Sequence, residues 1–227
     1  MASLCFDAVL FDCDGVLVDS EPLRLHVLRD MLAELGWHLS PERCKALFLG
    51  RATADDLRLI EARTGKKPSQ DWIDAFQLRR NQALRQHLVA VPSITSALQW
   101  LRAQGIPIAC ASAGEKDKIE LQLRQCMLID YFDGHLHSGV DLPRNKPHPD
   151  VYLAAAQGLG VDPKRCAIIE DSAIGIRAAV ASGATVFAYC PHYEAETAIA
   201  NGAQAVFHHM QQLPDTLLQY CRLQSTA

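Results

Sequence analysis

The segment VLFDCDGVLVDSE, residues 9–21, begins as an apolar strand and ends on two carboxylates set two positions apart, Asp12 and Asp14. Gly15 follows directly, and a glycine lets the chain leave a strand in conformations that a side chain would hinder. An apolar run that ends on paired acids indicates a buried strand whose carboxyl end carries chemistry. This strand therefore anchors the prediction of both the fold and the site.

Short apolar runs recur along the chain, separated by helix-like stretches, at residues 106–111, 166–169, 185–189 and 205–209. Continuous apolarity is typical of strands that are covered on both faces, and helices between such strands imply right-handed crossovers. The sequence therefore predicts an α/β fold with a doubly wound, Rossmann-like parallel sheet.

The pattern changes directly after the first strand, where four helix-like stretches follow without an intervening strand: 22–36, 40–50, 54–65 and 69–88. Ser40 and Pro41 form a typical cap and first-turn pair, and glycines at 36, 50 and 65 end three of these stretches. We expect a helical domain at residues 21–88, inserted into a core domain made of residues 1–20 and 89–227.

The composition excludes several classes of protein. Lysine and arginine number 22 against 26 acidic residues, a net charge of −4, so no basic excess favours nucleic acid as a partner. No segment reaches the roughly 18 apolar residues of a membrane span, and no export signal is indicated. The eight cysteines are scattered without a CxxC pair, which favours reduced, buried thiols. We expect a cytoplasmic monomer or homodimer.

Polar residues stand at the ends of the predicted strands, where ligands bind in open parallel sheets. Beyond Asp12 and Asp14 they are Ser112-Ala113-Gly114 after the second run, Lys146 before a helix, and Glu170-Asp171 after the run at 166–169. A cluster of carboxylates binds a hard cation such as Mg²⁺, while a hydroxyl, a lysine and backbone amides bind phosphate oxygens. Together these groups indicate a site for phosphoryl transfer.

Four motifs in order carry a resemblance to a known family: DCDGVLVDSE at residues 12–21, ASAG at 111–114, NKPHPD at 145–150 and EDSAIGIRAAVASGA at 170–184. They are similar to the ordered motifs of the haloacid dehalogenase-like hydrolases. The helical insertion resembles the C1 cap of the subfamily that contains phosphoglycolate phosphatases, sugar-phosphate and sugar-acid phosphatases such as 6-phosphogluconate phosphatase, and β-phosphoglucomutase.

The resemblance implies roles for the acids. Asp12 is expected to attack phosphorus and form an aspartyl phosphate that water then hydrolyses, with Asp14 as the acid and base. Mg²⁺ is expected to bind an Asp12 carboxylate oxygen, the backbone carbonyl of Asp14, and Asp171. Glu170 either reaches the metal directly, or acts through water or by fixing Lys146.

The resemblance also implies the phosphate-binding groups. Lys146 would neutralise charge between the nucleophile and the phosphate, and Ser112 with the amides of Ala113 and Gly114 would hold a phosphate oxygen. The implied partner is a small phosphorylated metabolite, namely phosphoglycolate, a sugar phosphate or a sugar-acid phosphate.

The inserted helices are expected to determine substrate specificity. The candidates for recognising the leaving group are Arg24, His26, Arg51 and Thr53. A phosphatase is favoured over a β-phosphoglucomutase-like mutase. Arg24 stands where the mutases carry a histidine, and Arg51 follows its glycine immediately rather than three residues later. A non-catalytic protein that binds metabolites or regulates others is the third alternative.

Overall fold

The computed structural model describes residues 4–49, 53–191 and 195–225. The chain divides into two compact units, which we call the sheet unit (Met1–Val18 and Ala90–Ala227) and the helical unit (Asp19–Val89). Each unit has its own core of buried apolar side chains. The division predicted from the sequence lies at residues 20/21 and 88/89.

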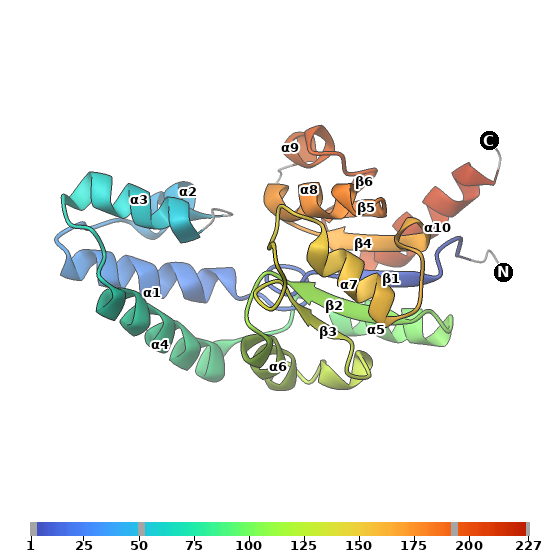
Figure 1. Cartoon of the computed structure of the whole chain (residues 1–227), viewed down its shortest axis with the longest axis horizontal. Coiled ribbons are helices and arrows are strands. Elements are labelled where there is room, and N and C mark those ends of the chain that lie inside the picture. Colours follow the sequence, from blue (N-terminus) through green and yellow to red (C-terminus); the bar gives the residue numbers. More distant parts are fainter. Residues whose placement is uncertain (1–3, 50–52, 192–194, 226–227) are drawn as a thin grey trace. The chain divides into compact units, whose positions relative to one another are not determined.

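In its described part, the sheet unit contains six parallel strands in the order β3-β2-β1-β4-β5-β6, flanked by helices (Figure 1). The strands are β1 (Ala8–Phe11), β2 (Ile108–Ser112), β3 (Leu136–Ser138), β4 (Cys166–Glu170), β5 (Thr185–Tyr189) and β6 (Ala205–Phe207). All four residues of β1 are buried, as expected for a strand covered on both faces. The predicted doubly wound parallel sheet is confirmed.

The helices of the sheet unit follow the strands along the chain: α5 (Ile94–Ala103), α6 (Lys116–Gln125), α7 (Asp150–Gly158), α8 (Ala173–Ala181), α9 (Ala195–Ala200) and α10 (Leu213–Gln224). Side chains of α7 and α8 pack in one cluster with Ala8 and Leu10 of β1. The strand order turns back at β1, because β2 pairs with one side of β1 and β4 with the other. Such a switch point is where ligands bind in open α/β sheets.

Three strands differ from the sequence prediction. The three-residue strand β3 was missed, because a run as short as Leu-His-Ser has no apolar pattern to read. Strand β2 starts at Ile108 and not at residue 106. The Ile106 amide donates to the carbonyl of Leu101 in α5, and Pro107 has no amide to donate. Strand β6 ends at Phe207, because the amides of both following histidines donate to the Gln212 side chain.

The helical unit contains α1 (Glu21–Glu34), α2 (Pro41–Phe48), α3 (Thr53–Thr64) and α4 (Gln70–His87) in its described part. The predicted cap is present, since the Ser40 hydroxyl accepts the Arg43 amide at 3.1 Å. Gly36 and Gly65 have φ values of 86° and 69°, a region that glycine enters without strain. Gly50, the third predicted stop, lies outside the described residues. No helix in the described ranges is long and apolar enough to span a bilayer.

A disulfide joins Cys5 to Cys221 of α10, with a Cα–Cα distance of 5.4 Å. For these two residues the pairing corrects the expectation of reduced, buried thiols. The two residues are 216 positions apart, so their spacing in the sequence gave no sign that they meet. The other six cysteines are free, and five of them are buried, as predicted.

The disulfide is expected to stabilise the sheet unit. Because it closes nearly the whole chain into one loop, reducing it should lower the free energy of unfolding by about 2–4 kcal/mol. Urea unfolding with and without dithiothreitol measures this difference. Cys221→Ser should unfold like the reduced wild type in either buffer, while the control Cys126→Ser keeps the dependence on reductant. Equal midpoints for oxidised and reduced wild type would contradict the prediction.

Candidate active site

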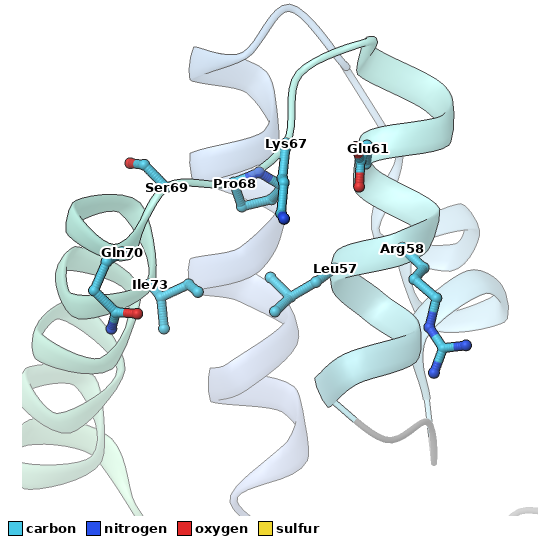
Figure 2. A pocket seen from close by; sticks show the side chains of 8 residues that line it. All are labelled: Leu57, Arg58, Glu61, Lys67, Pro68, Ser69, Gln70 and Ile73. Carbon is cyan, nitrogen blue, oxygen red and sulfur yellow. The ribbon is translucent and has the colours of Figure 1, made fainter.

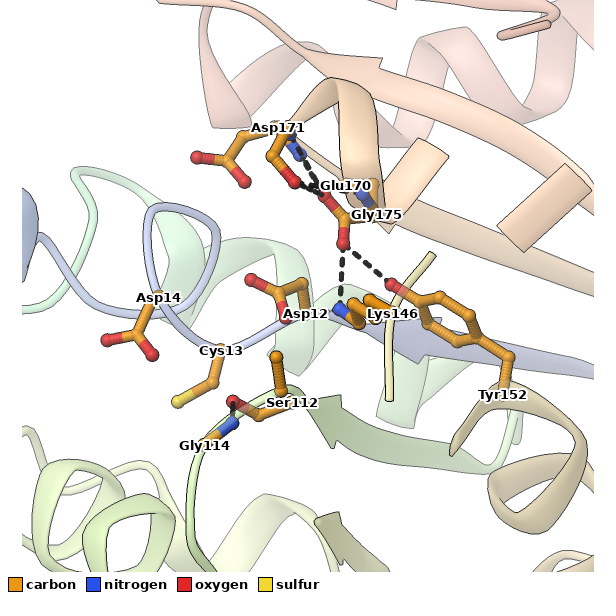
Figure 3. A network of polar contacts seen from close by, with 12 residues as sticks. Asp12, Cys13, Asp14, Ser112, Gly114, Lys146, Tyr152, Glu170, Asp171 and Gly175 are labelled. Carbon is orange, nitrogen blue, oxygen red and sulfur yellow. Dashed lines mark hydrogen bonds and ion pairs between the residues drawn. The ribbon is translucent and has the colours of Figure 1, made fainter. Parts of the chain in front are cut away.

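The predicted site residues of the sheet unit meet at the carboxyl ends of β1, β2 and β4 (Figure 3). Asp12 directly follows β1, Ser112 is the last residue of β2, and Glu170 is the last residue of β4. Lys146 comes from the loop before α7. Because the three strands are parallel neighbours, these ends lie on one edge of the sheet at its switch point.

Lys146 links two buried carboxylates. Its Nζ lies 2.6 Å from Asp12 Oδ1 and 2.7 Å from Glu170 Oε1, and its side chain is only 5 % exposed. Burial alone would lower the pKa of Lys146, but the charges of Asp12 and Glu170 hold that pKa well above its ordinary value. The lysine is therefore a fixed positive charge beside Asp12.

Glu170 accepts five hydrogen bonds. Lys146 Nζ and the Tyr152 hydroxyl donate to Oε1 at 2.7 and 2.8 Å, and Oε2 accepts the Asp171 amide with the amide and hydroxyl of Ser172 at 2.9–3.1 Å. Burial opposes ionisation, but Lys146 and the other donors hold the pKa of Glu170 below its ordinary value. The contact between Glu170 and Lys146, one of the alternatives left open by the sequence, is present in this structure.

Asp12 is a buried carboxylate with other carboxylates nearby. Burial raises its pKa to about 7, with further contributions from the charges of Glu170 and Asp14, against the opposing effect of Lys146. Asp12 and Glu170 share one buried lysine, and Asp171 lies beside them, so the carboxylates outnumber that lysine in a setting that suits a cation.

Carboxylate oxygens of Asp12, Glu170 and Asp171 lie within 4.8 Å of one another. Gly15 makes room for Asp171, because a Cβ at Gly15 would lie 2.1 Å from Asp171 Oδ2. Since the Glu170 oxygens already accept five donors, Asp12 and Asp171 are the carboxylates best suited to a cation. Oxygen donors of this kind fit a hard divalent cation and not the softer metals that prefer nitrogen or sulfur.

The loop after β2 presents the predicted phosphate-binding groups. The Ser112 hydroxyl is buried and accepts the Gly114 amide at 3.0 Å, which leaves its own hydrogen to donate. Asn145 was not among the predicted site residues. Its Nδ2 donates to the Ala113 carbonyl at 2.9 Å, and its Oδ1 accepts the Lys146 amide at 2.8 Å. Asn145 thus joins the loop of Ser112 to the loop of Lys146.

Three further contact residues were also missed. Tyr152 is fully buried on α7, with its ring centroid 4.7 Å from Lys146 Nζ, and Lys118 and Gln122 of α6 both contact Asp14. Lys118 and Gln122 stand four residues apart, the spacing that puts two side chains on one face of a helix. This spacing is the feature of the sequence that could have indicated a shared contact for Lys118 and Gln122. For Tyr152 the sequence shows only an apolar helix position.

The candidates in the helical unit have different surroundings. The Arg24 guanidinium donates to the carboxylates of Glu21 and Asp56 and to the Phe48 carbonyl, at 2.5–3.0 Å, all within this unit. His26 is exposed and lies 3.5 Å from Asp30. Thr53 begins α3, but its side chain is outside the described part of the structure, as is the whole of Arg51.

A pocket of about 580 Å³ lies within the helical unit, between α3 and α4 (Figure 2). Its described lining consists of Leu57, Arg58, Glu61, Lys67, Pro68, Ser69, Gln70 and Ile73. None of these residues was predicted as a site residue. The lining mixes both signs of charge with aliphatic groups, and no catalytic set is among them.

Comparison with known proteins decides the family. The model of the haloacid dehalogenase-like hydrolases matches residues 6–183, a range that contains every site residue of the sheet unit. The chain belongs to this family. The resemblance seen in the four motifs is thereby confirmed.

Two relatives in this family are named as phosphatases. The chain is 29 % identical over 211 residues to 6-phosphogluconate phosphatase of Escherichia coli K12, covering 92 % of this chain and 93 % of that protein. It is 34 % identical over 177 residues to hexitol phosphatase B of the same organism, covering 77 % and 79 %. These names are those of phosphoric monoester hydrolases, which confirms the predicted enzyme class.

Solved structures of the family share the fold. A haloacid dehalogenase-like protein of unknown function from Agrobacterium tumefaciens matches with a TM-score of 0.86 and 30 % identity, covering 95 % of this chain and 99 % of that one. A hydrolase of the family from Deinococcus radiodurans, determined with bound phosphate and sodium, matches with a TM-score of 0.82 and 34 % identity over 96 % and 97 %.

The Tyr152 contact predicts a stability effect at the candidate site. Tyr152→Phe removes a buried donor to an ionised carboxylate, so we expect a loss of about 1–3 kcal/mol in the free energy of unfolding. Chemical denaturation measures the loss. The control is Tyr220→Phe, which changes a half-buried tyrosine of the same unit. It should lower the free energy of unfolding by less than Tyr152→Phe does. Equal effects of the two substitutions would contradict a special role for the Tyr152 hydroxyl.

Proposed function

We propose that the chain is a Mg²⁺-dependent phosphatase that hydrolyses a small phosphorylated sugar, sugar alcohol or sugar acid through an aspartyl phosphate on Asp12. The observation that carries the proposal is the buried contact of Asp12 with Lys146, which is itself held by Glu170. A carboxylate beside a fixed cation, at the switch point of the sheet, suits attack on an anionic phosphate.

Each residue has one part in the reaction. Asp12 attacks phosphorus, and its O–P bond forms as the bond from phosphorus to the leaving oxygen breaks. Asp14 gives a proton to the leaving oxygen and later takes one from the water that attacks the aspartyl phosphate. Lys146 and the Ser112 hydroxyl bind phosphate oxygens and keep the phosphate in line with Asp12.

The cation would be held by a carboxylate oxygen of Asp12, by Asp171 and by the backbone carbonyl of Asp14. When bound, Mg²⁺ would supply positive charge that offsets the charge of the carboxylates and of the phosphate. The role we propose for Glu170 is to fix Lys146 and the first amides after β4, since its oxygens already accept five donors.

The substrate class follows the relatives and the helical unit. 6-Phosphogluconate phosphatase and hexitol phosphatase B act, by their names, on phosphorylated six-carbon acids and alcohols. We propose that side chains of the helical unit recognise the leaving group of the substrate. The candidates for this recognition are His26, Arg51 and Thr53. Arg24 is proposed to act mainly by tying α1 to α2 and α3, because its guanidinium is already engaged there.

A substrate panel tests the proposal. Purified protein with Mg²⁺ should release phosphate from at least one of 6-phosphogluconate, hexitol phosphates, phosphoglycolate and common sugar phosphates, and EDTA should abolish the release. The panel includes β-glucose 1-phosphate, for which formation of the 6-phosphate without free phosphate would identify a mutase. No release from any member of a broad panel would refute the proposed function.

The cellular setting is part of the same proposal. Phosphorylated metabolites favour a cytoplasmic enzyme, acting as a monomer or homodimer on a small molecule and not on nucleic acid or membranes. Disulfides are uncommon in reducing compartments, so Cys5–Cys221 is the feature that argues against a cytoplasmic location. Trapping thiols in whole cells tests this point, because an oxidised Cys5–Cys221 pair there would favour an oxidising compartment.

A further inference from the structure

Helix α6 holds the side chain of Asp14 by both carboxylate oxygens. Lys118 Nζ lies 2.7 Å from Asp14 Oδ2, and Gln122 Nε2 lies 2.7 Å from Asp14 Oδ1. The two donors stand one helical turn apart, so they reach the carboxylate from one face of the helix. Asp14, which lies in the loop after β1, is therefore fixed by side chains of α6.

The Gln122 contact is a buried and oriented one. Gln122 is fully buried, and its Oε1 lies 3.6 Å from Cys13 Sγ. A carboxylate can only accept, so the amide nitrogen must face Asp14 and the amide oxygen must face the Cys13 thiol. Burying a side-chain amide costs free energy unless its polar groups form hydrogen bonds. The contacts of Gln122 with Asp14 and Cys13 therefore offset the cost of burying this residue.

The helix itself is firmly seated. Ile119 directly follows Lys118, and Leu123 directly follows Gln122. Both of these apolar side chains are fully buried in the sheet unit. The Lys118 side chain is only 16 % exposed, and that of Asp14 is 32 % exposed. Two short contacts from an anchored helix leave the Asp14 carboxylate little freedom to rotate, while its exposed part faces solvent.

We infer that Lys118 and Gln122 are positioning residues that hold Asp14 in the orientation needed for its two proton transfers. This inference rests on the proposed function, in which Asp14 protonates the leaving oxygen and then accepts a proton from water. Proton transfer requires a short, aligned approach of donor and acceptor, and a freely rotating carboxylate meets this requirement only part of the time.

Leaving-group dependence separates this role from a merely structural one. An alkoxide needs a proton as it departs, whereas p-nitrophenolate departs without one. The value of kcat/KM reports the steps up to departure of the leaving group. We therefore expect Lys118→Met and Gln122→Leu to lower kcat/KM about tenfold to a hundredfold for the best alkyl phosphate of the panel, and less than about threefold for p-nitrophenyl phosphate. The loss should lie in kcat, with KM little changed.

Two comparisons make the test specific. Lys118→Arg keeps a charged donor and should restore part of the activity, while Lys116→Met, which removes an exposed lysine from the start of the same helix, should leave both substrates unaffected. In an Asp14→Asn background, Lys118→Met should cause little further loss, because residues that act through one group are not additive.

The outcomes distinguish this inference from the proposed function. Equal losses on both substrates, no loss on the alkyl phosphate, or a full additional loss in the Asp14→Asn background would overturn the positioning role while leaving the phosphatase intact. If the wild type hydrolyses neither p-nitrophenyl phosphate nor any alkyl phosphate, the proposed function fails and this inference fails with it.

Discussion

Asp12→Asn should abolish phosphate release, with a loss of roughly 10⁴- to 10⁶-fold in kcat, while the protein remains folded. The amide keeps the shape of the side chain but cannot form an aspartyl phosphate, so no slower version of the same covalent route remains. The measurement is phosphate release under single-turnover and steady-state conditions, on the substrate that gives the highest rate with the wild type.

The same variant should be no less stable than the wild type when Mg²⁺ is absent. Burial raises the pKa of Asp12 to about 7, so its ionised form is disfavoured in the folded state, and a neutral amide removes that cost. Lys146 still has Glu170 as a partner. The control for activity is Asp130→Asn, which changes an exposed acidic residue of the same unit and should leave phosphate release unchanged. Substantial turnover by folded Asp12→Asn would disprove the covalent route and favour a non-catalytic or water-activating site.

The centre of the fold could be predicted because its signals are local. The run before Asp12 is apolar at every position, which identifies a doubly covered strand, and the four polar segments follow such strands or precede a helix. The parallel sheet then brings segments more than a hundred residues apart to one edge. The proximity of Asp12 and Lys146 could therefore be predicted from the topology of the sheet, although nothing in the sequence links these two residues directly.

The contacts that orient these groups could not be predicted in the same way. Tyr152, Gln122 and Asn145 lie on helices or loops where a packing or surface role explains each residue type equally well. Their functions depend on which side chain lies opposite, and that is set by the packing of α6 and α7 on the sheet. The disulfide was missed for a related reason, because only the folded chain brings Cys5 and Cys221 together.

Gly175→Ala should cause the second large effect, although no side chain at this position takes part in the reaction. A Cβ at Gly175 would lie 1.6 Å from Glu170 Oε1 and 2.0 Å from its carboxyl carbon, so Glu170 must leave its place. Displacing it removes a partner from the buried Lys146. We expect a loss of about 3–5 kcal/mol in the free energy of unfolding, the usual cost of breaking a buried ion pair, and at least about a hundredfold loss in kcat.

The cause can be isolated with a second substitution. Alanine in place of glycine ordinarily favours a helix, by up to about 1 kcal/mol in its interior, so a large loss must come from the clash and not from the helix. Glu170→Asp shortens the obstructing side chain by one methylene, and the double variant Glu170→Asp/Gly175→Ala should therefore be more stable than Gly175→Ala alone. Chemical unfolding of the four proteins gives the coupling free energy. Strict additivity would show that the methyl group acts elsewhere, whereas a favourable coupling would establish that Gly175 is required because Glu170 occupies the space above it.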